Sequence, residues 1–110
     1  MKIIDYTTAG GKNVIIEYID KLPEHEKARI YRARQKIMDE GKEALEAMTT
    51  RPLRGKMWEI KLDANRIMYV LADGENIYFL HVCKKQKNKA EKFELDKAIK
   101  RAKEFGLKVD

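Results

Sequence analysis

The chain has 110 residues, of which 44% are hydrophobic and 38% are charged, and its net charge of +6 favours polyanionic partners over acidic ones. This length suffices for one hydrophobic core, so a single domain over residues 1–110 is expected. Cys83 is the only cysteine, so the chain cannot form an intramolecular disulfide. No apolar stretch is long enough for a membrane span or a secretory signal. We therefore expect a cytoplasmic protein that does not contact membranes.

The first half of the chain is predicted to be mainly helical. A short β-prone run at residues 2–6 comes first. Apolar residues then recur at helical spacing over residues 12–21, and again after Pro23, which suits the first turn of a helix. Gly41 is predicted to end this second helix, because glycine is the residue most often found at that position. A shorter helical piece is expected over residues 42–48.

From residue 49 onward the pattern indicates strands. Residues 57–62 alternate apolar and polar side chains, as a half-buried strand does. Residues 65–71 and 77–83 are apolar at consecutive positions, which predicts central strands with both faces covered. Between them, Asp73-Gly74 is typical of a tight turn. These three strands should therefore form one antiparallel sheet.

The chain is predicted to close with a helix. Apolar residues recur at helical intervals from Phe93 to Phe105, and Gly106 should end the helix. The order of elements is then β-α-α-β-β-β-α. This order predicts an α+β fold, a mainly antiparallel sheet with an N-terminal helix pair and a C-terminal helix.

Positive charge is concentrated late in the chain, where residues 84–110 carry a net charge of +5 and residues 1–83 only +1. Four lysines fall within six residues directly after a predicted buried strand: Lys84, Lys85, Lys87 and Lys89. Their mutual repulsion costs stability unless an anion neutralises it. From its charge alone, the cluster is as consistent with RNA or DNA binding as with a merely solvated surface.

Residues 51–56 and Arg66 add further cations. Residues 51–56 are interpreted as a cationic loop that enters a strand, and a solvated turn would look the same. Arg66 begins an otherwise apolar strand, where a guanidinium group needs a partner, either a carboxylate or a phosphate. The sequence leaves these two partners open.

The strand over residues 57–62 is predicted to have one solvent-exposed face. Glu59 and Lys61 share that polar face, while Trp58 is assigned to the core rather than to base stacking.

Cys83 has no associated histidine and aspartate pattern, so it is not expected to be a nucleophile. No metal-ligand spacing occurs in the chain, and we expect neither a metal nor another cofactor.

In their order and spacing, these segments resemble the phage-derived branch of the RelE/HigB toxin superfamily. Four segments carry the resemblance: Pro52-Leu53-Arg54-Gly55, Trp58-Glu59-Ile60-Lys61, Arg66-Ile67-Met68-Tyr69 and Leu80-His81-Val82-Cys83-Lys84-Lys85. The junction Leu22-Pro23-Glu24 and the pair Glu40-Gly41 also fit, so the resemblance covers nearly the whole chain. It implies a compact RelE-like domain whose concave sheet face receives RNA.

The resemblance also implies a function. Such toxins cleave mRNA, typically in the ribosomal decoding site and without metal, by attack of a ribose 2′-hydroxyl on the adjacent phosphate. The implied partners are mRNA, the ribosome and a cognate antitoxin, expected to be a small helix-turn-helix protein. The implied catalytic residues are Lys61 and Arg66 as phosphate clamps, Lys84 and Lys85 near the scissile group, and His81 as a titratable group. The implied RNA-binding residues are Arg51, Arg54, Lys56, Lys87 and Lys89.

Three features bear on these roles. His81 shares the strand parity of Ile77 and Phe79, so a packed structural histidine fits equally well. Many relatives carry arginine where this chain has Lys61, and a lysine cannot clamp a phosphate with two parallel hydrogen bonds. Many also carry proline where this chain has Ala90. Two alternatives therefore stay open: a non-catalytic basic nucleic-acid-binding module, and an inactive toxin fold that binds a protein partner.

Overall fold

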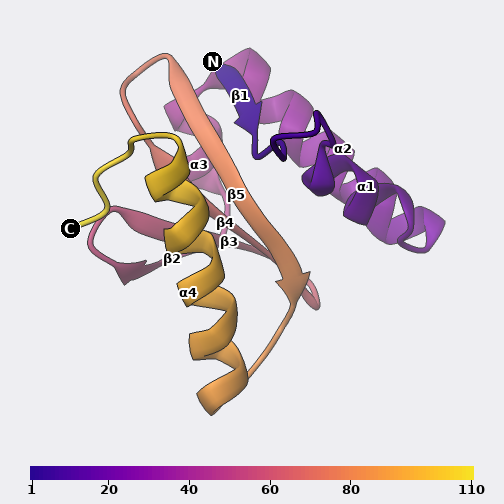
Figure 1. Ribbon diagram of the computed structural model, residues 1–110. Helices are drawn as coiled ribbons and strands as arrows, with labels where there is room; N and C mark the ends of the chain where they lie inside the picture. Colours follow the sequence, from indigo (N-terminus) through magenta and orange to yellow (C-terminus); the bar gives the residue numbers. More distant parts are fainter.

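A computed structural model describes residues 1–110 as four helices and one five-stranded sheet (Figure 1). The helices are α1 (Val14–Asp20), α2 (Glu24–Glu40), α3 (Lys42–Ala47) and α4 (Asn88–Glu104). The strands are β1 (Lys2–Asp5), β2 (Thr50–Arg54), β3 (Met57–Leu62), β4 (Asn65–Leu71) and β5 (Asn76–Lys84). The predicted α+β fold is confirmed. None of the four helices combines the length and the apolarity needed to span a bilayer.

The sheet has the strand order β1-β5-β4-β3-β2. Strands β2 to β5 pair antiparallel with their neighbours, which confirms the three predicted consecutive strands, and β1 adds to β5 in parallel. β4 and β5 lie inside the sheet, as their uninterrupted apolar runs predicted. Both are largely buried for that reason.

The helix boundaries follow local chemistry. Asn13 caps α1, because its side-chain Oδ1 accepts a hydrogen bond from the backbone N–H of Ile16 at 3.0 Å. α2 begins directly after Pro23 and ends at Gly41, whose φ of +65° favours glycine and whose N–H donates to the carbonyl of Ile37. α4 begins at Asn88, five residues before the first apolar residue that indicated it, so Lys89 lies on this helix rather than in a loop.

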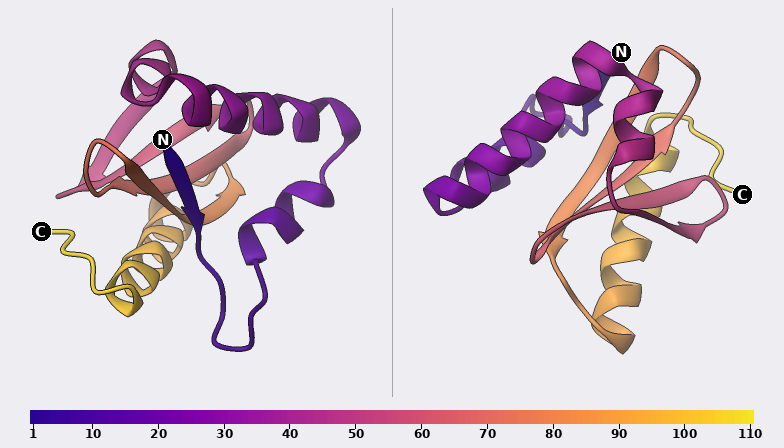
Figure 2. Two further views of the ribbon diagram at one scale, coloured as in Figure 1. Left: turned by 90° about the horizontal axis from the view of Figure 1, so that it is seen from above. Right: turned by 180° about the vertical axis from the view of Figure 1, so that it is seen from behind.

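The helices cover the two faces of the sheet, α1 to α3 on one side and α4 on the other. The left view of Figure 2 shows α2 above the sheet and α4 below it. The larger core packs α1, α2 and α3 against one face through Ile15, Ile19, Ile30, Ile37, Leu45, Ile60, Ile67 and Phe79. The smaller core packs α4 against the other face through Met57, Met68, Val70, Leu80, Cys83, Ala98, Ile99 and Ala102.

One predicted loop is a strand. Most of the cationic segment 51–56 belongs to β2, an edge strand paired with β3. Pro52 is tolerated there because an edge strand has one side free of ladder hydrogen bonds, and it pairs opposite Trp58. The nearby proline and glycine favour a loop, whereas the strand forms because of its pairing with β3, which local sequence does not reveal.

The alternation of faces along β3 is as predicted, but the predicted burial was wrong at two positions. Trp58 was assigned to the core but is 37% exposed, because its face of the sheet near the β2 edge is left partly uncovered. Glu59 was assigned to the solvent-exposed face but is only 2% exposed. α4 and two arginines cover that face, as described below.

A bulge in β5 decides where His81 points. Tyr69 pairs with Phe79 and Met68 pairs with His81, so Leu80 has no partner on β4. The extra residue resets the alternation, and His81 meets α4 although Phe79 packs in the core on the opposite face. The parity argument from the sequence was therefore wrong, while the alternative of a packed histidine agrees with the 7% exposure of His81.

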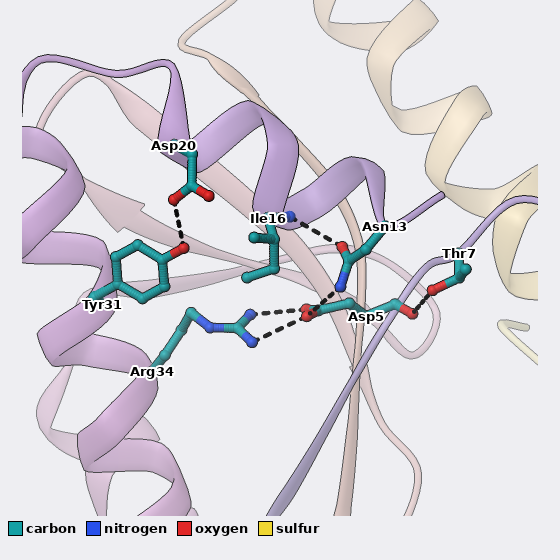
Figure 3. Close-up of polar contacts among 7 residues, drawn as sticks. All are labelled: Asp5, Thr7, Asn13, Ile16, Asp20, Tyr31 and Arg34. Atoms are coloured by element: carbon teal, nitrogen blue, oxygen red, sulfur yellow. Dashed lines mark hydrogen bonds and ion pairs between the residues drawn. The ribbon is translucent and has the colours of Figure 1, made fainter. Parts of the chain in front are cut away.

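A buried ion pair joins β1, α1 and α2. Both terminal guanidinium nitrogens of Arg34 donate to the carboxylate of Asp5, at 2.7 and 2.9 Å, and Asn13 donates to the same carboxylate at 3.1 Å (Figure 3). The Arg34 and Asp5 side chains are 11% and 8% exposed. A second contact, from the Tyr31 hydroxyl to Asp20 at 2.6 Å, links α2 to the end of α1.

Candidate active site

A pocket of about 230 Å³ opens between the sheet and the first half of α4. Five cations predicted from the sequence line it: Arg51, Lys61, Arg66, Lys85 and Lys87. Three carboxylates line it as well: Glu59, Glu91 and Glu94. The pocket thus draws charged side chains from β2, β3, β4, α4 and the segment between β5 and α4.

Strand register explains why these residues meet. Lys61 pairs with Arg66, and Arg66 pairs on its other side with Cys83, so the three side chains lie in one row across β3, β4 and β5. Glu59 and Met68 form the next row on the same face, since every second residue of a strand shares a face. Both rows lie beneath the N-terminal half of α4.

Glu59 anchors the two arginines of the pocket. Arg51 donates from Nε to the Glu59 carboxylate at 3.0 Å, and the Nε of Arg66 lies 3.7 Å from the same oxygen. The backbone carbonyls of Asp63 and Asn65 also accept hydrogen bonds from Arg66, at 2.6 and 3.0 Å. Within the chain, Arg66 thus has a carboxylate as its ion-pair partner, and these contacts hold its guanidinium group at the pocket wall.

Arg51 also reaches α4. Its guanidinium group hydrogen-bonds Glu91, and this bond raises the pKa of Arg51 above its ordinary value. The contact ties the edge strand to the first turn of the helix. Because Glu59 and Glu91 each pair with an arginine, their negative charges are already partly neutralised.

Lys84 and Lys85 point to different sides of the molecule. Lys85 lines the pocket, whereas Lys84 donates from Nζ to Glu26 of α2 at 2.7 Å. Asn65 donates to the same carboxylate at 2.8 Å, and the Lys84 and Asn65 hydrogen bonds together lower the pKa of Glu26. The structure therefore separates these two predicted site residues.

His81 lies behind the pocket wall, between two charged residues of α4. Its Nε2 hydrogen-bonds the carboxylate of Glu94, and its Nδ1 accepts from the Arg101 guanidinium at 3.1 Å. Burial lowers the pKa of His81, against a smaller opposing effect of Glu94. Since an arginine can only donate, the imidazole is neutral and carries its proton on Nε2.

The sulfur of Cys83 completes this group. One ligand atom from each of His81, Cys83 and Glu94 lies within 4.8 Å of the others, a clustering that the sequence spacing did not indicate. Burial raises the pKa of Cys83 to about 12, so the thiol stays protonated at neutral pH. A metal ion would have to displace the protons on the sulfur and on Nε2, so without one the cluster is a hydrogen-bonded group.

The remaining predicted RNA-binding residues lie outside the pocket. Arg54 is 3.6 Å from the Asp110 carboxylate near the end of the chain. Lys56 borders a separate groove of about 450 Å³, with Trp58 and Leu71 among its lining residues. Lys89 is exposed on the first turn of α4.

Sequence reasoning missed the carboxylates of α4. Glu91 and Glu94 are three residues apart and so share one side of the helix. That spacing follows the lysine run and could have suggested acids facing a basic site. An acidic residue on an amphipathic helix is, however, most often solvated, and only the packing of α4 shows that these two meet the sheet.

A family model described as "Phage derived protein Gp49-like (DUF891)" matches residues 17–103 of the chain. The matched residues include β2 to β5, α2, α3 and all the charged residues of the pocket. No curated protein matches the chain.

Proposed function

The chain belongs to the Gp49-like family of phage-derived, toxin-like proteins, and we propose that it is the toxin of a toxin–antitoxin pair that cleaves messenger RNA. The observation that carries the proposal is the pocket, where five cations from four parts of the sheet and its connections surround one cavity. Such an arrangement suits a phosphodiester that gains negative charge as it is cleaved. The proposed partners are mRNA on the ribosome and an antitoxin protein of the helix-turn-helix type.

In the proposed reaction a ribose 2′-hydroxyl attacks the adjacent phosphorus atom. Arg66 and Lys61 stabilise the additional charge on the phosphate oxygens, and Lys85 donates a proton to the departing 5′-oxygen. Arg51 and Lys87 hold the RNA backbone at the pocket mouth. Arg66 is well suited to its role because Glu59 and two backbone carbonyls fix its position before RNA binds. The reaction requires no metal ion.

The first test is single-turnover cleavage of mRNA on programmed ribosomes by the purified protein. The expected products are a 2′,3′-cyclic phosphate and a 5′-hydroxyl end. Induced expression should also arrest translation, and a co-expressed antitoxin should relieve the arrest. An intact mRNA together with tight RNA binding would instead favour the non-catalytic binding module. Intact mRNA without RNA binding would favour the inactive fold that binds a protein partner.

Neighbouring lysines provide a matched pair of variants for the same assay. Lys85→Ala should slow cleavage about a hundredfold, as expected for losing one positioned electrostatic contact. Lys84→Ala removes the same charge one residue away but on the side of α2, and it should cleave within about threefold of the wild type. Equal losses in both variants would contradict the assignment of Lys85 to the pocket chemistry.

A further inference from the structure

The proposed reaction needs a group that accepts the 2′-hydroxyl proton, and three carboxylates line the pocket. Glu59 is paired with Arg51 and Arg66, and Glu91 is paired with Arg51. A carboxylate that pairs with a guanidinium group is a weak proton acceptor, because the cation favours its ionised form. Glu94 is the pocket carboxylate with no arginine among its ion-pair partners.

The partner of Glu94 is a neutral imidazole. His81 donates from Nε2 to the Glu94 carboxylate, and Arg101 selects this tautomer by donating to Nδ1. Arg101 is itself anchored by its hydrogen bond to the carbonyl of Leu80 at 3.0 Å. A neutral donor of this kind orients a carboxylate without itself bringing a positive charge to it, as a second residue does for the base in many acid–base sites.

Burial and access at Glu94 also suit a base. Its side chain is 19% exposed, so it is partly withdrawn from water while it still reaches the pocket. Cys83 lies beside it and stays protonated, so the thiol adds no negative charge next to Glu94. The β5 bulge makes this arrangement possible, because it turns His81 toward α4.

We propose that Glu94 is the general base of the RNA-cleavage reaction, with His81 and Arg101 as positioning residues; this inference rests on the proposed function. The 2′-hydroxyl proton passes to a Glu94 carboxylate oxygen while the 2′-oxygen forms a bond to phosphorus. The bond from phosphorus to the 5′-oxygen then breaks, and Lys85 supplies the proton that the 5′-oxygen takes. The products are the cyclic phosphate and the 5′-hydroxyl end.

The test compares Glu94→Gln with Asp96→Asn in single-turnover cleavage of mRNA on programmed ribosomes at saturating protein. Asp96 lies on the same helix, pairs with Lys92 in solvent and does not line the pocket, so its substitution removes the same charge outside the site. Glu94→Gln should lower the rate at least about a hundredfold, the usual contribution of a general base. Asp96→Asn should remain within about threefold of the wild type.

Binding is measured in parallel with the same mRNA carrying a single 2′-deoxyribose at the cleavage position, which prevents cleavage. Glu94→Gln should bind this RNA as the wild type does. If Glu94→Gln weakens binding and leaves the saturated rate unchanged, Glu94 is not the base. If the wild type does not cleave mRNA at all, both the proposed function and the inference about Glu94 fail. If the wild type cleaves and Glu94→Gln cleaves as well, only the inference about Glu94 fails.

A pH profile distinguishes a base from a residue that only supports the fold. The wild-type rate at saturation should fall at acidic pH as the base becomes protonated, and Glu94→Gln should lack this limb. The charged and titratable groups around Glu94 come from several elements: Tyr18 of α1, Glu59 and Lys61 of β3, Arg66 of β4, His81 and Cys83 of β5, Lys85 and Lys87 after β5, and Glu91 and Arg101 of α4. In His81→Gln the cleavage rate should therefore still fall at acidic pH, but at a different pH than in the wild type. A wild-type profile without an acidic limb overturns the inference, even if Glu94→Gln fails to fold.

Discussion

At the residue scale, the environment of a charged side chain decides its role more than its identity does. Lys84 and Lys85 are adjacent and chemically identical, yet one pairs with Glu26 of α2 and the other lines the pocket. The alternation of side chains at the end of β5 separates them. Arg66 shows the same principle, because burial beside Glu59 fixes the position of its guanidinium group.

His81 predicts a pH dependence of stability. Burial lowers its pKa in the folded protein below the value of about 6.5 that it has in the unfolded chain. Between these two values the unfolded chain binds more protons, so the free energy of unfolding should fall as the pH falls below about 6.5. Chemical denaturation between pH 7.5 and pH 5 would measure this slope. Three carboxylates have a lowered pKa, and they reduce the stability only below their ordinary pKa values, 4.5 for Glu17 and Glu26 and 3.8 for Asp73.

The two histidines of the chain offer a matched comparison for this slope. His81→Gln should flatten it, because glutamine does not titrate. His25→Gln removes an exposed side chain from the first turn of α2 and should leave the slope of the wild type. An equally steep slope in His81→Gln would show that another group causes the pH dependence.

At the element scale, the turn between β2 and β3 depends on a contact with the C-terminal segment. Gly55 has a φ of +54°, and the N–H of Lys56 donates to the carbonyl of Val109 at 2.5 Å. A Cβ atom at position 55 would lie 2.1 Å from that carbonyl oxygen. The glycine of the Pro-Leu-Arg-Gly segment is therefore required both for the backbone conformation and for the close approach of the last residues.

We expect Gly55→Ala to destabilise the protein by more than about 1 kcal/mol, since alanine disfavours positive φ and its methyl group would displace Val109. Urea denaturation would measure the change in the free energy of unfolding. Gly74→Ala is the matched control, because no atom lies within 4 Å of a Cβ there and φ is not positive. Its effect should stay within about 0.5 kcal/mol. A Gly55→Ala variant as stable as Gly74→Ala would contradict the structural role of the turn.

At the scale of the whole molecule, the N-terminal strand depends on the ion pair that joins it to the helices. Asp5 lies on β1, whose backbone pairs only with β5, and its carboxylate binds Arg34 of α2 and Asn13 at the start of α1. The pair is buried, so loss of one member leaves a desolvated charge without a partner. The three elements should therefore loosen together when this contact is removed.

Asp5→Ala should cost about 3–5 kcal/mol of stability, the range for breaking a buried pair. Thermal or urea unfolding would measure the loss, and hydrogen exchange should show faster exchange in β1, α1 and α2. Asp20→Ala removes the more exposed hydrogen bond to Tyr31, so it should cost only about 1 kcal/mol. Similar losses in both variants would mean that the Asp5 pair contributes no more than a surface contact.

The sequence by itself predicted the features that depend on neighbouring residues. Apolar spacing indicated the helices, uninterrupted apolar runs indicated the central strands β4 and β5, and Gly41 and Gly106 indicated where helices end. Each of these follows from the periodicity or the backbone preference of a few consecutive residues. The concentration of cations after residue 83 was also plain, because it requires only counting.

Only the tertiary structure decided which of these charges share a site. The burial of Glu59 depends on α4 and on Arg51, which lies on an edge strand that was expected to be a loop. The orientation of His81 depends on a bulge that no local pattern revealed. Burial and pairing are properties of surfaces brought together from distant parts of the chain, so the alternation within one strand cannot determine them.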